Sequence, residues 1–226
     1  MRQDRDGGTW RGIDELTERP VSILILSPEN PHLADVVDAA LRATDLDDPR
    51  LVRILDAGNV PVSFVVTQRI VGRDLPRLLA DGPLPAESAR RVVGETALAL
   101  VSAARSGLHH LRLGPRSVVV RPEGQVVLNG LAINAAAVGI EEPNAELAER
   151  ADAVGLVRLL YAALTCRWPS QPVAGLAAAH RIAGRPVAPG DLVAGVPADL
   201  DALCVQTLAE GGGPRSPSEV VERLGT

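Results

Sequence analysis

The sequence contains no lysine, and all 23 of its basic residues are arginines. Arginine stays charged in proteins and cannot serve as a tunable amine, so catalysis by a lysine side chain is excluded. Cysteine is also scarce: Cys166 and Cys204 lie far apart and lack the paired spacing of zinc and redox motifs. We therefore expect two reduced thiols in the core rather than a disulfide.

The sequence also contains few histidines, and its net charge is small. The only two of the four histidines that lie close together in sequence are His109 and His110, and adjacent side chains point apart on most backbones. We therefore predict no metal site. The net charge of −5 argues against sequence-independent nucleic-acid binding, which needs a clustered basic face.

No stretch approaches the ~20 apolar residues that cross a membrane. The N-terminus, M-R-Q-D-R-D-G-G, has no apolar signal core. With 226 residues, of which 46% are hydrophobic, the chain can bury a substantial core. We expect a cytoplasmic protein that does not itself span a membrane.

The first part of the chain alternates strand and helix signals. Residues 20–26, P-V-S-I-L-I-L, form a short β-branched run, which predicts a buried strand. Residues 30–46 carry apolar side chains at helical spacing, and two further strands are predicted for 51–58 and 62–68. The order is strand, helix, strand, strand.

The rest of the chain is mostly helical. A helix through 89–104 is followed by two short strands around the turn signal P-E-G-Q at 122–125. Further helices are predicted for 148–164, 198–210 and 216–224, with a Pro-, Gly- and Ala-rich linker between the first two. A small β-rich part thus precedes a larger helical part, and the predicted fold class is α+β.

Five stretches occur in the order in which similar stretches occur in one known family. They are T-W-R-G-I-D-E-L-T-E-R-P-V-S-I-L, D-D-P-R-L-V-R-I-L-D-A-G, V-V-T-Q-R-I-V-G-R-D-L-P-R-L-L-A-D-G-P-L-P, A-D-A-V-G-L-V-R-L-L-Y-A-A-L-T and G-G-G-P-R-S-P-S-E-V-V-E-R-L. On these matches the chain resembles the bacterial serine/threonine protein kinase family over nearly its whole length. The resemblance implies a bilobal kinase-like fold with a polar tail at 1–8, a truncated N-lobe at 9–71 and a mainly helical C-lobe at 72–226.

The first stretch resembles the family's second and third strands. The resemblance therefore implies that the first strand and the glycine-rich loop are missing, with only Gly7 and Gly8 before Trp10. The exposed edge would then pair with another chain or be covered by the N-terminal segment. The third stretch resembles the segment that joins the lobes. Its hinge residues are Thr67, Gln68, Arg69 and Ile70.

The positions that carry the family's chemistry hold other residues here. The catalytic loop, H-R-D-L-K-P-x-x-N in the family, reads H-L-R-L-G-P-R-S-V, so Arg112 replaces the aspartate base and Gly114 the lysine. Leu24 stands at the lysine of V-A-I-K, Ser117 falls near the metal-binding asparagine, and Gly130 replaces the aspartate of D-F-G. Phosphoryl transfer depends on these positioned charges. The resemblance therefore implies a pseudokinase, not an enzyme, with neither ATP nor magnesium as a cofactor.

Three positions match residues that the family keeps for structure. His110 and Leu131 stand where a histidine and a phenylalanine stack in a hydrophobic spine. Asp152 stands where an aspartate accepts hydrogen bonds from the catalytic-loop backbone. Asp152 is also the alternative candidate for a base.

A closer likeness lies chiefly in the C-terminal third. Y-A-A-L-T-C-R-W-P, P-G-D-L-V-A-G-V-P and G-G-G-P-R-S-P-S resemble the intracellular pseudokinase domain of actinobacterial MviN-type (MurJ-type) lipid II flippases. This likeness implies a regulatory scaffold in peptidoglycan synthesis, which an active serine/threonine kinase phosphorylates and which recruits a forkhead-associated (FHA) protein. It also implies a place at the inner face of the cell membrane, by fusion or tethering to a membrane protein. Thr9 and Thr226, near the chain ends, are the candidate phospho-acceptors.

Two other functions stay open from the residues alone. The first is a sensor that binds adenosine phosphates at the hinge without turnover. The second is weak phosphotransfer or nucleotidyl transfer, for which Asp152, Asp56 and Arg112 are the candidates.

Overall fold

An antiparallel sheet of five strands forms the N-terminal part of the computed structural model, which describes residues 2–4 and 7–225. In chain order the strands are β1 (Arg2–Asp4), β2 (Gly7–Ile13), β3 (Pro20–Leu26), β4 (Ile54–Gly58) and β5 (Phe64–Gln68). Across the sheet the order is β1-β2-β3-β5-β4. The strand predicted at 20–26 is confirmed, and those at 51–58 and 62–68 are confirmed in shorter form.

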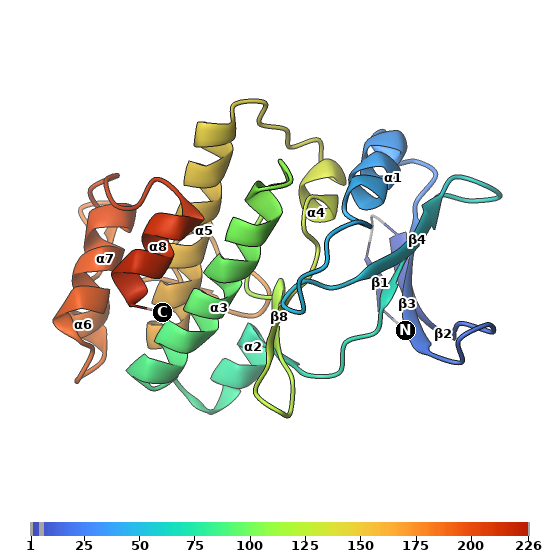
Figure 1. Ribbon diagram of the computed structural model, residues 1–226. Coiled ribbons are helices and arrows are strands. Elements are labelled where there is room, and N and C mark those ends of the chain that lie inside the picture. Colours follow the sequence, from blue (N-terminus) through green and yellow to red (C-terminus); the bar gives the residue numbers. More distant parts are fainter. Residues whose placement is uncertain (1, 5–6, 226) are drawn as a thin grey trace.

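Helix α1 (Leu33–Arg42) covers the sheet beside β4, as Figure 1 shows. Its apolar side chains recur at helical spacing and form one buried stripe. Val36 and Val37 of this stripe belong to the same core cluster as Val65 of β5. The helix predicted at 30–46 is thus confirmed, but it starts later and ends earlier than predicted.

The N-terminal segment covers the edge of β2, which is one of the two alternatives expected for that edge. β1 pairs with β2, with Arg2 opposite Thr9 and Asp4 opposite Gly7. The strand that covers this edge is three residues long. Gly7 and Gly8 also belong to β2, so the described residues of the segment predicted as a polar tail, 2–4 and 7–8, lie in strands.

A small sheet connects the five strands to the helices. Its order is β6-β7-β8, formed by β6 (Arg73–Asp74), β7 (Val118–Val120) and β8 (Val126–Leu128). Strands β7 and β8 confirm the two short strands predicted around 122–125. After β6 the chain forms the short helices α2 (Leu75–Leu78) and η1 (Leu79–Asp81).

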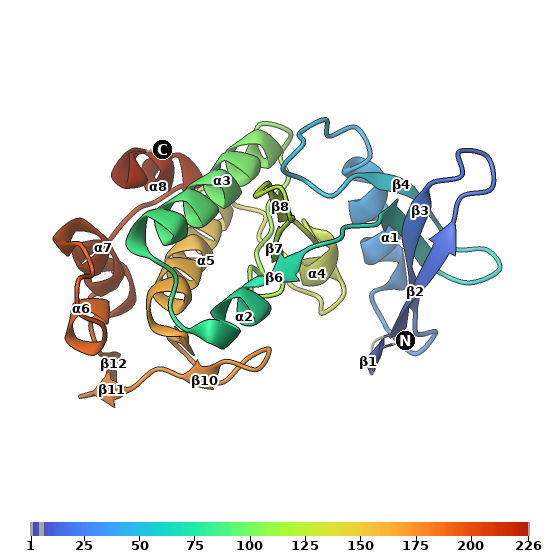
Figure 2. The same ribbon diagram turned by 90° about the horizontal axis from the view of Figure 1, so that it is seen from below.

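The helical part is built around α5 (Ala145–Thr165), which is buried along most of its second half. Three other long helices pack against α5 or against one another: α3 (Ala86–Ala104), α7 (Ala198–Leu208) and α8 (Pro217–Leu224). Figures 1 and 2 show them as a bundle at the end of the molecule opposite the five-stranded sheet. All four confirm predicted helices. None of the helices within 2–4 and 7–225 is long and apolar enough to cross a membrane.

The segment between α5 and α7 has more structure than the predicted linker. It contains the two-residue strands β9 (Arg167–Trp168), β10 (Ala177–Ala178), β11 (Arg181–Ile182) and β12 (Arg185–Pro186), and the short helix α6 (Pro189–Leu192). The Tyr161 hydroxyl of α5 donates to the carbonyl of Val187 at 2.9 Å and fixes this segment to the core. Cys166, half-buried, and Cys204, buried, are both free thiols.

Candidate functional site

A buried carboxylate on α5 holds the loop between α3 and β7. Asp152 is 1% exposed, and its two carboxylate oxygens accept the backbone N–H groups of His110 (2.8 Å) and Leu111 (2.7 Å). Leu111 has a φ of +57°, a strained conformation for leucine that these bonds help to hold. Burial raises the pKa of Asp152 to about 6, against the lowering effect of the two N–H groups. Asp152 therefore serves as an anchor for the backbone.

The imidazole of His110 is fully buried in this loop. Its Nε2 bonds to the carbonyl oxygen of Asn129, just after β8, at 3.1 Å. Because a carbonyl only accepts, Nε2 carries the proton. Within the described residues Nδ1 has no hydrogen-bond partner. Burial lowers the pKa of His110 to about 4, so the ring is a neutral tie between the loop and the segment after β8.

His110 is expected to make the stability depend on pH. Its pKa is about 4 in the folded chain and 6.5 when unperturbed, so the unfolded chain takes up the proton first as the pH falls. The folded state should lose on the order of 2–3 kcal/mol across this interval. Glutamine does not titrate, so the variant His110→Gln does not lose this stability. In urea unfolding, the amount by which His110→Gln is less stable than wild type should therefore shrink as the pH falls from 6.5 to 4. The exposed His180→Gln is the control, and a pH-independent difference for His110→Gln would contradict this assignment.

Gly130 lies after β8, at the position where the kinase resemblance places a metal-binding aspartate. Its φ is +80°, in the left-handed region that favours glycine. A Cβ at this position would collide with the side-chain amide of Asn134. The backbone N–H of Asn134 also donates to the Gly130 carbonyl at 3.1 Å. The amide thus occupies the place where a side chain at position 130 would begin, and such a side chain would have to displace it.

Arg112 extends from the loop to this same segment. Its Nη1 donates to the carbonyl oxygen of Asn134 at 3.4 Å, and its side chain is otherwise exposed. A guanidinium has no acceptor atom, so it cannot take a proton from a hydroxyl. At the position of the expected base, the chain thus has a cation bound to its own backbone.

Gly114 and Ser117 form a turn in which each hydrogen-bonds to the other. The Gly114 N–H donates to the Ser117 hydroxyl at 3.3 Å, and the Ser117 N–H donates to the Gly114 carbonyl at 2.9 Å. The Ser117 carbonyl in turn accepts the N–H of Asn129 at 2.7 Å. Ser117 is 5% exposed, so its hydroxyl shapes the loop and does not face an open metal site.

Leu24 lies in the middle of β3, opposite Thr9 of β2 and Val65 of β5. Its half-buried side chain packs against the core. In kinases the lysine expected at this position pairs with a glutamate of the neighbouring helix. On α1, the exposed carboxylate of Asp38 pairs instead with Arg42 one turn later, at 3.0 Å. The position of the expected lysine is therefore apolar, and the carboxylate on the helix is engaged within that helix.

The predicted hinge, 67–70, begins in β5 and continues past its end. The N–H of Gln68 donates to the carbonyl of Arg53 at 2.8 Å, and the N–H of Arg69 donates to the carbonyl of Pro20 at 3.4 Å. These two backbone donors are satisfied by other parts of the same chain. They are therefore not free for an adenine unless these bonds break.

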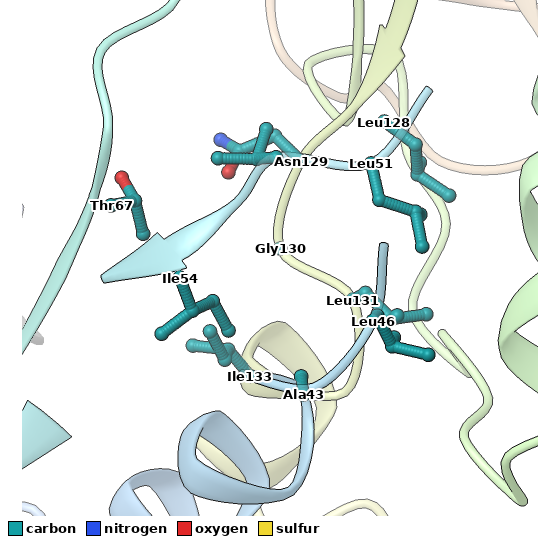
Figure 3. A pocket seen from close by; sticks show the side chains of 11 residues that line it. Ala43, Leu46, Leu51, Ile54, Thr67, Leu128, Asn129, Gly130, Leu131 and Ile133 are labelled. Carbon is teal, nitrogen blue, oxygen red and sulfur yellow. The ribbon is translucent and has the colours of Figure 1, made fainter. Parts of the chain in front are cut away.

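A small cavity lies between α1, the sheet and the segment after β8 (Figure 3). Its volume is about 20 Å³, room for about one water molecule. Besides Thr67, Asn129 and Gly130, the labelled residues around it are aliphatic: Ala43, Leu46, Leu51, Ile54, Leu128, Leu131 and Ile133. Leu131, expected in a spine, is 6% exposed and part of the core cluster. Small-molecule sites have volumes of about 300–1,000 Å³, so this cavity does not admit an adenine.

A larger groove of about 440 Å³ lies between α1, the loop at 107–111 and the segment at 132–143. Its lining includes the carboxylates of Asp35, Asp38, Glu141 and Glu142. Arg42 and His109 also line it, and burial lowers the pKa of His109, which favours the neutral ring. The negative walls repel phosphate groups, so the groove suits a nucleotide poorly.

Of the two predicted phospho-acceptors, Thr9 and Thr226, the structure describes Thr9. Thr9 is not in a tail: it lies in β2, between β1 and β3, with an exposed side chain. Thr226 lies outside the described residues.

Comparison with known proteins gives relatives but no family model that matches. The chain is 27% identical over 149 residues to the probable serine/threonine-protein kinase pknA2 of Bifidobacterium longum, which covers 61% of this chain and 20% of that protein. It is 28% identical over 121 residues to the probable serine/threonine-protein kinase CPE1738 of Clostridium perfringens, covering 51% and 18%. It is 24% identical over 199 residues to serine/threonine-protein kinase PknB of Mycobacterium leprae, covering 76% and 32%.

The chain therefore spans between 18% and 32% of the length of these curated relatives. Their names support the kinase resemblance expected from the five stretches. The mixed α+β fold is consistent with that relationship. This chain is similar to bacterial serine/threonine kinases.

Proposed function

We propose that this chain is a catalytically inactive kinase-like domain that acts as a scaffold and phospho-acceptor in serine/threonine kinase signalling. The observation that carries the proposal is position 130, which holds a glycine in the left-handed region, with the amide of Asn134 where a Cβ would stand, and no carboxylate. Phosphoryl transfer needs metal ions that neutralise the charge developing on the phosphates. A glycine beside a neutral amide supplies no carboxylate at this position to hold and neutralise them.

The other chemical positions support the same proposal. Leu24 offers no charge to a phosphate, and Arg112 offers no acceptor to a hydroxyl proton. When an enzyme that catalyses such a group transfer loses one of these groups, the transition state is destabilised by roughly a few kcal/mol. Several losses in one site leave little basis for weak residual activity.

The sensor function has less support. Binding without turnover would still need room for an adenine and donors at the hinge. The cavity behind the hinge is about 20 Å³, and the N–H groups of Gln68 and Arg69 are already bonded. The larger groove is acidic. ATP and magnesium are therefore not part of the proposed function.

The proposed partners come from the likeness of the C-terminal third to the MviN-type pseudokinase domain. They are an active serine/threonine kinase and an FHA protein that binds the resulting phosphothreonine through an arginine cluster. In this proposal the domain acts at the inner face of the membrane, in the regulation of peptidoglycan synthesis, and is fused or tethered to a membrane protein.

Phosphothreonine formation tests this function. The folded chain is incubated with ATP and magnesium, with or without the kinase domain of a relative such as PknB of Mycobacterium leprae. We expect phosphothreonine only when the kinase is added, because the chain lacks the groups for self-phosphorylation. Mass spectrometry of the intact chain counts the phosphates, and fragmentation of its peptides shows whether they lie on threonine. Labelling without added kinase would contradict the inactive domain, and no labelling with it would contradict the acceptor role.

A further inference from the structure

Most described threonines cannot reach the active site of another kinase. Thr96, Thr165 and Thr207 are at most 8% exposed. Each hydroxyl donates at 2.7 Å to the carbonyl four residues earlier in its helix. Thr44 and Thr67 are half-buried, Thr44 with its hydroxyl bonded to Leu41 and Thr67 in the wall of the small cavity. Within 2–4 and 7–225, the exposed threonines are Thr9 and Thr17.

Thr9 is exposed but held in place. It is opposite Arg2 of β1 on one side and Leu24 of β3 on the other. A kinase binds its acceptor residue as part of a separate segment, so modification of Thr9 would require the middle of β2 to leave the sheet. Breaking pairing on both sides costs the folded state several backbone hydrogen bonds.

Thr17 lies in the turn that joins β2 to β3, residues 14–19. The turn projects beyond the end of the sheet, away from the helices (Figures 1 and 2). Its tip is solvated: Thr17 is exposed, and the preceding Leu16 is 96% exposed. The turn belongs to no helix or strand, so a partner can bind it without unpairing the sheet.

We infer that Thr17 is the phospho-acceptor of this chain, an inference that rests on the proposed acceptor function. In the step, the Thr17 Oγ attacks the γ-phosphorus of an ATP bound to the partner kinase. The Oγ–P bond forms as the bond to ADP breaks, and the hydroxyl proton passes to the base of that kinase. The acceptor sequence that the turn offers is E-L-T-E, in which Glu15 and Glu18 lie on either side of Leu16 and Thr17.

Asp14 links the modification to the shape of the turn. Its Oδ1 accepts the N–H groups of Leu16 at 2.9 Å and Thr17 at 3.0 Å, and these bonds lower the pKa of the Asp14 carboxyl. A phosphate on Thr17 adds about −1.5 to −2 charges beside this carboxylate, and the repulsion weakens both bonds. The modified turn then presents a phosphate, flanking carboxylates and the exposed Leu16. This combination matches a reader whose site is rich in arginine.

The test maps the modified residue and compares two matched variants, Thr17→Ala and Thr9→Ala. Both remove an exposed hydroxyl from the same hairpin, but only Thr17 lies in the turn. After labelling by the PknB kinase domain, we expect phosphate on Thr17, loss of most of it in Thr17→Ala and none of it in Thr9→Ala. An isolated FHA domain should retain the phosphorylated wild type and not phosphorylated Thr17→Ala.

The outcomes separate this inference from the proposed function. Phosphothreonine at Thr9, Thr226 or elsewhere would overturn the assignment of Thr17 and leave the acceptor role intact. No phosphothreonine at any position would overturn both. Equal FHA binding by wild type and Thr17→Ala would overturn the reader part of the inference.

Discussion

Replacing Gly130 by aspartate is expected to destabilise the fold and not to restore a metal site. The left-handed backbone costs a non-glycine residue about 1–2 kcal/mol. The new side chain must also displace the Asn134 amide, which is the end of a flexible side chain and costs less to move than rigid core atoms. Gly130→Asp should therefore lower the free energy of unfolding by about 1–3 kcal/mol. Urea unfolding, with and without magnesium and ATP, measures both the loss and any rescue by ligand.

Gly124 supplies the matched control. Its φ is +87°, close to that of Gly130, but a Cβ there meets nothing within 4 Å. Gly124→Asp should therefore show the backbone cost alone, and Gly130→Asp should be clearly worse. Removing the obstruction as well, in Gly130→Asp with Asn134→Ala, should recover part of the difference. A Gly130→Asp variant as stable as the Gly124→Asp control, or stabilised by magnesium and ATP, would refute the proposed geometry.

Asp152→Ala should be among the most damaging single substitutions. It leaves the N–H groups of His110 and Leu111 buried without acceptors, and each unsatisfied buried group costs about 1–3 kcal/mol. We expect a loss of about 2–6 kcal/mol in the free energy of unfolding. Asp152→Asn should lose less, because its amide oxygen can still accept one of the two N–H groups.

Asp38→Ala serves as the comparison for this loss. Asp38 is an exposed carboxylate whose ion pair with Arg42 lies one turn away on the helix surface, so its removal should cost about 0.5 kcal/mol or less. If Asp152→Ala were no more destabilising than Asp38→Ala, Asp152 would not be the anchor of the loop. The alternative function of Asp152 as a base would then regain support.

The helices and strands whose apolar residues recur at regular spacing, or form a β-branched run, were predictable from the sequence. The β-branched run at 20–26 gave β3 with matching bounds, and the apolar stripe near 148–164 gave α5. The short strands β9 to β12 were not predicted, because two-residue strands carry no period. β1 was missed because its three polar residues, R-Q-D, form a strand only through pairing with β2.

At the candidate site, the sequence predicted which residue types are missing but not what replaced them. The order of motifs placed Arg112 and Gly130 at chemical positions. The contribution of Asn134 could not be read from its spacing, because it depends on the positive φ of Gly130 and the turn that follows. The same limit applied to Thr17, whose exposure depends on the way Asp14 closes its turn.

Thermal unfolding with saturating ATP and magnesium, manganese or a chelator tests directly whether this chain binds a nucleotide. A ligand at ~100 times its dissociation constant stabilises a protein by about 2.7 kcal/mol, which would raise the unfolding midpoint of a chain of this size by about 5–10 °C. The kinase domain of PknB from Mycobacterium leprae serves as the positive control. We predict no shift for this chain under any of these conditions. A metal-dependent shift of several degrees would show that the chain binds a nucleotide and would contradict the proposed inactive site.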